Sequence, residues 1–396
     1  MERILFITGR FVRGDYPNGN CVKNISKELK NKHMDIDFLC IEPVSSLSVS
    51  RPDNADLITY RENLSVVRGL IHNLFRIFYL PLDHWELINK SVKKVCMLYE
   101  KNKYDAIIAT VNPMESAEIV RRVKKRYPEV KFIIYEIDPA SNRFKNPSSL
   151  LEKYYSHKAY GFEKRVYASC NHVFHMITHK NHFEKDKYMK YRDKSSYLDI
   201  PSFQVNLVSR DYNANKCKFI YAGMFYPVLR RPDYMMTLMG TLGLEKSFVT
   251  DIFTGGIMQQ EVETIAKRYP GCIKIKSMIP KKELVEKYHE YSCLLSVGNK
   301  NSNFLPSKVL DYIGTGMPVI HFYSDLNDVA IPYLKKYSKA LLIDQNTSIE
   351  SAKTEILAFL DKVDDFRIVG DELSKLYYKN TPVYTAEELV KEICKN

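Results

Sequence analysis

Short apolar runs alternate with amphipathic segments along the first half of the chain. The runs lie at residues 3–8, 36–41, 106–110 and 131–137. Between them, apolar positions at helical spacing predict a helix with Val22, Ile25 and Leu29 on one face, and a second helix over Glu115–Arg126. Strands without internal alternation, each followed by a helix, are typical of a parallel sheet that is covered on both faces.

The same alternation returns in the second half. Apolar runs lie at residues 218–222, 249–254, 273–276, 293–297 and 319–322. The sequence therefore predicts two doubly wound α/β domains, with a boundary near residues 201–216 and the polar residues 209–216 as a linker. The tail predicts a closing amphipathic helix that begins at a capping box formed by Thr385 and Glu388.

Composition excludes several classes of protein. The 396 residues are 45% hydrophobic and 27% charged, with 15 Gly and 17 Pro, which excludes a disordered or collagen-like chain. No apolar segment reaches the roughly 18 residues of a membrane-spanning helix, and the N-terminus lacks the pattern of a signal peptide. The eight cysteines contain no Cys-x-x-Cys pair. We therefore expect a cytoplasmic protein with free thiols.

The positive charge is concentrated in the first half. Of a formal net charge of +12, the first 200 residues carry +10 and the rest +2. Such a field favours an anionic partner, either a phosphorylated ligand or a membrane surface, with an ordinary solvated surface as the alternative. Residues 64–85 combine apolar positions at helical spacing, among them Phe75 and Phe78, with Arg68 and Arg76. This helix either lies in a membrane interface or packs into the core.

Residues 303–320 carry the most informative pattern for function. Pro306 and Ser307 predict a helix start, and Lys308 and Asp311 share the side opposite its buried face. A helix N-terminus offers free backbone N–H groups, which suits a phosphate or diphosphate. A carboxylate one turn further along is placed to accept hydrogen bonds from ribose hydroxyls.

This stretch resembles the donor-site segment of GT-B glycosyltransferases, especially those of the retaining family 4 type. Their pattern runs from one Glu through seven residues to a second Glu, and then to a Gly, a Pro and a Val-Ile strand. Asp311 matches the second acid, whereas Asn303 stands in place of the first. The resemblance implies that Asp311 binds the ribose, Lys308 the diphosphate and Asn303 the transferred sugar or phosphate. It also places Ser307 in the donor site.

A second match lies at the opening of the second domain. The strand 218–222 ends at Gly223, and a loop that carries Arg230 and Arg231 follows it. A planar guanidinium binds two phosphate oxygens at once, which suits the donor diphosphate. Many family members have arginine directly after the glycine, but this chain has Met224. Arg230 is therefore the expected diphosphate partner, and Arg231 is second.

In the first domain the resemblance points to two further positions. Residues 14–20 lie where the family has a glycine-rich loop, and Gly19 matches best, with an ordinary turn as the alternative. The strand 131–137 runs into Asp138, where many members have a histidine near the reacting sugar and others have Asp. A carboxylate at the end of a parallel strand lies at the ligand-binding edge of the sheet. Asp138 is thus a catalytic candidate for positioning the sugar or acceptor, with helix capping as the alternative.

The resemblance implies an α/β fold of two Rossmann-like doubly wound domains facing a cleft. Residues 1–205 would bind the acceptor and residues 206–375 the nucleotide sugar, while residues 376–396 would return to the first domain as a helix. The expected activity is a hexosyltransferase that moves sugar from a nucleotide diphosphate sugar to a glycan or lipid-linked acceptor. The family implies retention of anomeric configuration and suggests a role in surface polysaccharide synthesis, on the inner face of the membrane.

Neither a metal, nor a cofactor beyond the donor substrate, nor a nucleic-acid partner is expected. The series Cys170, His172, His175, His179 and His182 has the residue types of a zinc site. On a strand over residues 173–177, however, these spacings would scatter the side chains across both faces. Two alternatives to a glycosyltransferase stay open: a non-catalytic accessory subunit that keeps the fold, and an epimerase that acts on sugar nucleotides.

Overall fold

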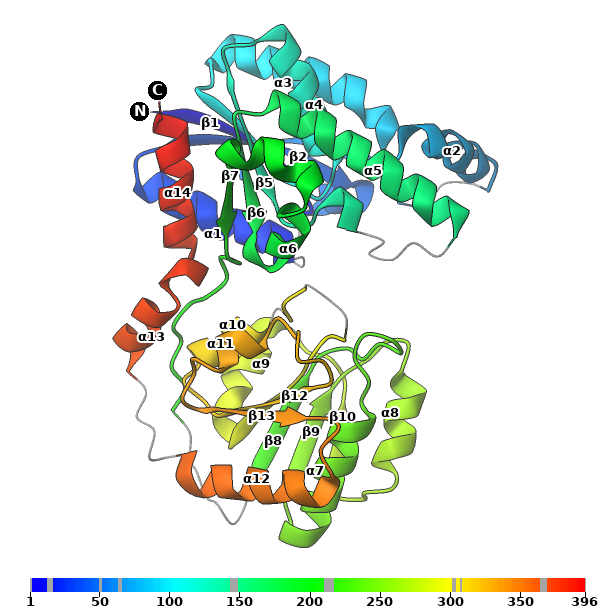
Figure 1. The fold of residues 1–396 in the computed structure, drawn as a ribbon, viewed down its shortest axis with the longest axis vertical. Helices are drawn as coiled ribbons and strands as arrows, with labels where there is room; N and C mark the ends of the chain where they lie inside the picture. The colour runs from blue at the N-terminus through cyan, green and yellow to red at the C-terminus, as the bar shows by residue number, and fades with distance from the viewer. Residues whose placement is uncertain are drawn as a thin grey trace. The chain divides into compact units, whose positions relative to one another are not determined.

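The computed structural model describes residues 2–12, 17–49, 52–62, 66–142, 149–209, 217–300, 304–306, 308–363 and 369–395. The chain divides into two compact units (Figure 1). Unit 1 comprises Met1–Ser202 and Lys379–Asn396, and unit 2 comprises Phe203–Tyr378. The sequence predicts these boundaries after residues 205 and 375. None of the helices within the described ranges has the length and apolar character needed to cross a bilayer.

Unit 1 is built on a parallel sheet of seven strands in the order β3-β2-β1-β4-β5-β6-β7. The strands are β1 (Arg3–Gly9), β2 (Asp35–Pro43), β3 (Ala55–Tyr60), β4 (Ala106–Val111), β5 (Lys131–Glu136), β6 (His172–Met176) and β7 (Ser195–Leu198). Alternate residues of β1 pack into two separate apolar clusters, one on each face. The sheet is therefore buried on both sides, as its uninterrupted apolar strands require.

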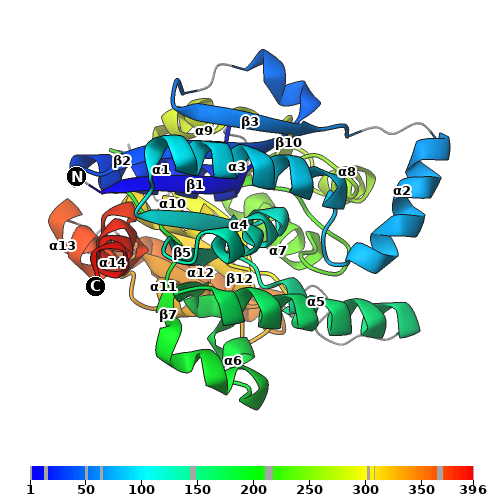
Figure 2. The same ribbon diagram turned by 90° about the horizontal axis from the view of Figure 1, so that it is seen from above.

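Helices cover both faces of this sheet (Figure 2). The helices of unit 1 are α1 (Pro17–Asn31), α2 (Val66–Tyr79), α3 (Ile88–Asn102), α4 (Glu115–Arg126), α5 (Leu150–Ser169), α6 (Lys180–Phe183) and α14 (Pro382–Cys394), of which α2 lies to one side of the sheet. The short helices η3 (Ala140–Asn142) and η5 (Asp186–Lys194) follow β5 and α6. Leu389 and Ile393 of α14 pack in the same cluster as Val22 and Ile25 of α1. The prediction that the C-terminal helix returns to the first domain is confirmed.

The start of α14 differs from the prediction. The N-cap is Thr381, whose hydroxyl accepts a hydrogen bond from the Tyr384 N–H, and Pro382 occupies the first helical turn. Thr385 is fully buried inside the helix. The predicted capping box at Thr385 and Glu388 is therefore wrong, because proline at the first helical position begins the helix one turn earlier.

Unit 2 is built on a parallel sheet of six strands in the order β10-β9-β8-β11-β12-β13. The strands are β8 (Lys218–Ala222), β9 (Val249–Phe253), β10 (Ile273–Lys276), β11 (Cys293–Val297), β12 (Val319–Tyr323) and β13 (Ala340–Asp344). The helices are α7 (Asp233–Lys246), α8 (Gln259–Ala266), α9 (Lys281–Lys287), α10 (Lys308–Gly314), α11 (Ile331–Leu334), α12 (Ile349–Lys362) and α13 (Gly370–Leu376). The main apolar cluster joins α7, α8 and α12 to one face of the sheet. The prediction of two doubly wound α/β domains is confirmed.

Candidate donor-binding site

Adjacent parallel strands bring two of the predicted donor-site segments together in unit 2. Gly223 follows β8 directly, and its N–H donates to the Phe253 carbonyl at 3.0 Å. β11 pairs with β8, so the carboxyl ends of these strands meet at one edge of the sheet. From the loop after β8, Arg230 donates through Nε and Nη2 to Oδ1 of Asn299, at 3.1 and 2.7 Å. Asn299 lies just beyond β11 and is 5% exposed.

The two arginines of this loop differ in their charge environment. The partner of Arg230 is a neutral amide, and no carboxylate within the described ranges forms an ion pair with it. Arg231 instead donates to Asp233 at 2.8 Å and also pairs with Glu261. The positive charge of Arg231 is therefore compensated, whereas the charge of half-buried Arg230 stays available to an anion. Arg230 is also the residue that the sequence analysis expects to bind the diphosphate, with Arg231 as the second candidate.

Helix α10 begins at Lys308 and carries Asp311 one turn later. Burial lowers the pKa of Lys308, and the nearby Lys281 lowers it further while Asp311 opposes the shift. Within the described ranges Lys308 forms no ion pair, and the carboxylate that acts on it electrostatically is that of Asp311. Both oxygens of Asp311 instead lie 2.8 Å from Nζ of Lys281, at the start of α9.

Two residues that the sequence analysis did not single out thus contact predicted site residues. Asn299 contacts Arg230, and Lys281 contacts Asp311. Nothing in the local pattern separates Lys281 from Lys282 beside it, because the contact depends on how α9 packs beside α10. Two further predicted residues, Asn303 and Ser307, lie outside the described residues, so their roles stay predictions.

Gly19 has a structural explanation of its own. It lies in the first turn of α1, which begins at Pro17, so the prediction of a loop through residue 20 is wrong at this end. The helix starts earlier because proline suits its first turn. A Cβ at Gly19 would overlap the Arg10 carbonyl oxygen, so the close approach of the two backbones requires glycine there. Its proposed place in the donor site is a separate prediction.

Asp138 follows β5 by two residues at the carboxyl edge of the unit 1 sheet. Its side chain is 33% exposed, and Oδ1 lies 3.6 Å from Nε2 of the buried His179. The pairing with His179 gives Asp138 a side-chain partner on the segment that follows β6. The carboxylate is thus held at the strand end but still reaches solvent.

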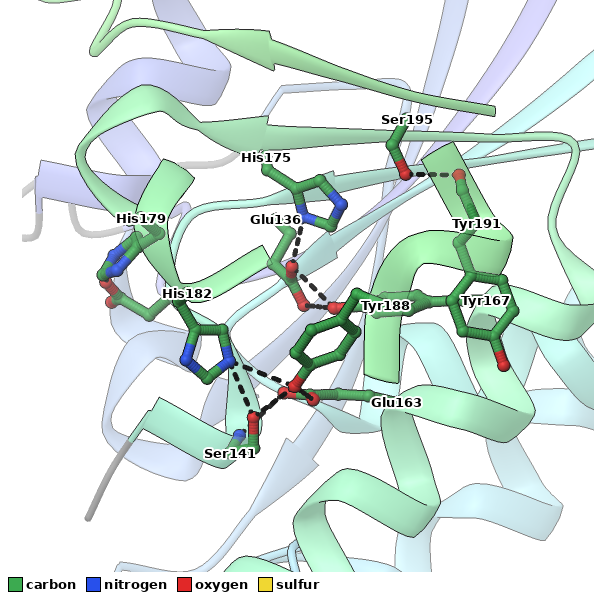
Figure 3. Close-up of polar contacts among 11 residues, drawn as sticks. Glu136, Ser141, Glu163, Tyr167, His175, His179, His182, Tyr188, Tyr191 and Ser195 are labelled. Atoms are coloured by element: carbon green, nitrogen blue, oxygen red, sulfur yellow. Dashed lines mark hydrogen bonds and ion pairs between the residues drawn. The ribbon is translucent and has the colours of Figure 1, made fainter. Parts of the chain in front are cut away.

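Two buried carboxylates lie beside this strand end (Figure 3). Glu136 accepts a hydrogen bond from the Tyr167 hydroxyl and contacts Nδ1 of His175, both at 2.7 Å. Glu163 accepts from the Ser141 N–H at 2.7 Å and from the Tyr188 hydroxyl at 2.6 Å. Burial raises the pKa of each carboxyl group to about 7. Sequence reasoning missed both, although Glu136 ends an otherwise apolar strand.

The histidines of the suspected zinc series contact different partners. His172 contacts Ser196, His175 contacts Glu136 and His182 contacts Ser141. Burial lowers the pKa of His175 and of His182 to about 3, so both rings are neutral at pH 7. The described ranges contain no group of three His, Cys, Asp or Glu residues arranged to hold a metal ion.

Comparisons with solved structures identify the fold. Sucrose-phosphate synthase from Thermosynechococcus elongatus matches with a TM-score of 0.66 at 10% identity, over 99% of this chain and 98% of that one. The apo form of the lipopolysaccharide outer core galactosyltransferase WaaB matches with a TM-score of 0.55 at 13% identity, over 99% of both chains. An alpha-glucosyltransferase in complex with UDP and a mismatched 13-mer DNA matches with a TM-score of 0.56 at 11% identity, over 100% of both.

These likenesses cover both units, so the chain has the two-domain GT-B fold of glycosyltransferases. No family model matches the sequence, and no curated protein matches it. The third structure holds DNA, so this fold occurs in a protein bound to nucleic acid. The expectation that this chain has no nucleic-acid partner therefore stays a prediction, as does the assignment to family 4.

Proposed function

We propose that this protein is a glycosyltransferase that binds a nucleotide diphosphate sugar in unit 2. The observation that carries the proposal is Arg230, a half-buried arginine at the carboxyl edge of the sheet whose charge no carboxylate compensates within the described ranges. A buried cation without a counter-ion is costly, so a site that keeps one is suited to an anionic ligand. Lys308 adds a second partly buried amine, with Asp311 one turn further along the same helix.

The proposed roles of the cationic residues follow from the negative charge that forms on the leaving diphosphate. Breaking the bond between the sugar and the diphosphate leaves negative charge on the diphosphate oxygens, and Arg230 and Lys308 stabilise that charge. Asp311, which Lys281 holds at both oxygens, accepts hydrogen bonds from the ribose through its remaining lone pairs. Ser307 and Gly223 border the donor, and Asn303 contacts the transferred sugar or its phosphate.

The acceptor binds in unit 1. Asp138 positions the sugar or the acceptor hydroxyl, and its partial exposure and its pairing with His179 support that role. The reaction is proposed to retain the anomeric configuration and to need no metal. The third neighbour contains UDP, and WaaB is a lipopolysaccharide galactosyltransferase. A uridine diphosphate sugar and a surface-glycan or lipid-linked acceptor are therefore the first to test.

Contact with a membrane surface belongs to the same proposal. The described side chains of α2 include Leu74, Phe75 and Phe78, which are 62%, 48% and 66% exposed. The alternative that this helix packs into the core is therefore wrong for these side chains. Exposed apolar rings in the half of the chain with most of the positive charge support binding to an anionic lipid surface on the cytoplasmic side, although Arg76 itself pairs with Asp83.

One departure supports a second candidate, a non-catalytic subunit that keeps the fold. Met224 stands where many family members have the arginine after the glycine, and its side chain is 40% exposed. A panel of labelled sugar nucleotides with glycan and lipid-linked acceptors tests the choice. Transfer or slow hydrolysis of one donor supports the glycosyltransferase, and an isomerised donor indicates an epimerase. Full occupancy by a nucleotide sugar without any turnover would overturn the enzyme proposal.

A further inference from the structure

Asn299 contacts both segments of the candidate donor site: the loop that carries Arg230 and the segment that leads into α10. Its amide oxygen accepts the two hydrogen bonds from Arg230, and its Nδ2 donates to the Phe304 carbonyl at 2.9 Å. Phe304 opens the segment that leads into α10 and Lys308. The next residue, Lys300, donates its backbone N–H to the Leu229 carbonyl at 2.8 Å. The turn that carries Arg230 is thus tied to the end of β11 twice, once by side chains and once by backbone.

The end of β11 is itself rigidly held. Gly298 donates its N–H to the Phe322 carbonyl at 2.9 Å, and a Cβ at this position would overlap the carboxylate of Asp328. Asp328 is buried and lies 3.2 Å from Nε2 of His321, whose Nδ1 lies 3.0 Å from the Ser296 hydroxyl. The backbone that leads into Asn299 is therefore held in place, and both the oxygen and the nitrogen of its buried amide are hydrogen-bonded.

The chemistry of the side chain explains why an amide is suited here. The amide of Asn combines an acceptor with a donor on one planar group, and both are used, toward Arg230 and toward Phe304. A carboxylate at this position would orient the guanidinium equally well but would cancel its charge. Arg231 illustrates that outcome, since Asp233 and Glu261 compensate it.

We propose that Asn299 is a positioning residue that orients the Arg230 guanidinium for the donor diphosphate while leaving its positive charge uncompensated. The inference deepens the proposed function and rests on it. It predicts that the amide, and not merely a polar side chain of this size, is required at residue 299. Asn299 acts through Arg230, so its contribution to diphosphate binding must disappear when Arg230 is removed.

The test measures binding of inorganic pyrophosphate and of UDP by calorimetry. In Asn299→Asp we expect an affinity about 10- to 100-fold lower than in the wild type, the range for losing a charged hydrogen bond. Asn299→Ala loses orientation without adding charge and should weaken binding less. Asn346→Asp adds the same charge at the end of β13, on the far side of β12, and should leave binding unchanged. Thermal denaturation shows that each variant is folded.

A double-mutant cycle separates positioning from general structural support. In the Arg230→Ala background, Asn299→Ala, which adds no charge, should have no further effect on pyrophosphate binding. An equal loss in that background, or unchanged binding in Asn299→Asp alone, overturns the proposal. The Nε–H signal of Arg230 in nuclear magnetic resonance gives a readout without ligand. It should be protected from exchange in the wild type and lose that protection in Asn299→Ala.

The two readouts distinguish the failure of this inference from that of the proposed function. A wild-type protein that binds neither pyrophosphate nor UDP contradicts the donor site, whatever Asn299 does. A wild-type protein that binds both, with an Arg230 signal that Asn299→Ala leaves unchanged, contradicts the positioning role alone.

Discussion

Glu163 is a carboxyl group buried among hydroxyl and amide partners, and its ionisation should affect stability. The titratable groups that face it are Glu136 on β5, His175 on β6, His182 on α6, Lys187 and Tyr188 on η5, and Tyr167 on its own helix α5. Burial raises its pKa from the ordinary 4.5 to about 7, with the neighbouring Glu136 adding to the shift. The folded protein therefore binds this proton more tightly than the unfolded chain does.

The raised pKa of Glu163 makes the stability of the folded protein depend on pH. Because the folded state holds more protons between pH 4.5 and 7, the free energy of unfolding falls as the pH rises through this window. The side chain of Glu163→Gln cannot ionise. The free energy of unfolding of this variant, compared with that of the wild type, should therefore rise by about 1–3 kcal/mol from pH 5 to pH 8. Chemical denaturation at both values measures the change. The exposed Glu184→Gln is the control, and an equal gain there would contradict the prediction.

Asp311 offers a second test at the scale of one side chain. Asp311→Ala should weaken nucleotide diphosphate binding by about 1–3 kcal/mol, because a charged hydrogen-bond partner of the ribose is lost. Lys281→Ala should weaken it less, since the carboxylate stays but loses the cation that holds both of its oxygens. Calorimetry with UDP measures both. Unchanged affinity in Asp311→Ala would remove this residue from the site.

Sequence reasoning found the charged residues of the candidate site but not what holds them. Lys308 and Asp311 could be named because their spacing within one segment resembles a family pattern, and Arg230 because it follows a strand that ends in glycine, as in the same family. Asn299 and Lys281 come from other segments, and only the pairing of β8 with β11 and the packing of α9 beside α10 bring them into contact. Contacts of that kind leave no local signal in one sequence.

The elements show the same division between local and tertiary signals. The strands β8, β10 and β11 match their predicted bounds. β8 and β11 are bounded apolar runs at the centre of the sheet, whereas β10 lies at its edge and alternates Ile with Lys. The strands β3, β7 and β13 were not predicted. β7 and β13 lie at sheet edges and contain mostly half-buried residues, so their pattern lacks the continuous apolar character of a central strand.

The helix α2 gives a prediction at the scale of one element. Its exposed aromatic face should insert into the interface of anionic lipid vesicles, so the double substitution Phe75→Ser and Phe78→Ser should reduce vesicle co-sedimentation severalfold. Met97→Ser is the matched control, because Met97 on α3 is also apolar and 65% exposed. Co-sedimentation that Met97→Ser reduces equally would contradict a role specific to α2. Because both rings are exposed, the double variant should stay folded, which thermal denaturation checks.

At the scale of the whole molecule, the chain passes from unit 1 to unit 2 and back again. The last segment, Lys379–Asn396, belongs to unit 1, although the whole of unit 2, Phe203–Tyr378, separates it from the rest of that unit. Its helix α14 fills the face of the sheet that α1 covers, so unit 1 can complete its core only when the C-terminal segment is present. The resemblance to GT-B glycosyltransferases predicts this return, which the amphipathic pattern alone does not.

The stability of unit 1 should therefore depend on α14 independently of unit 2. Leu389 is fully buried against α1, and Leu389→Ala should lower the free energy of unfolding of unit 1 by about 2–5 kcal/mol. Trp85 is the one tryptophan in the sequence and lies in unit 1, so its fluorescence during denaturation reports on that unit. Leu360→Ala makes a matched cavity on α12 of unit 2 and should leave the Trp85 transition in place. Equal shifts of the Trp85 transition in both variants would mean that the units unfold together, and no shift in Leu389→Ala would mean that α14 does not complete the core of unit 1.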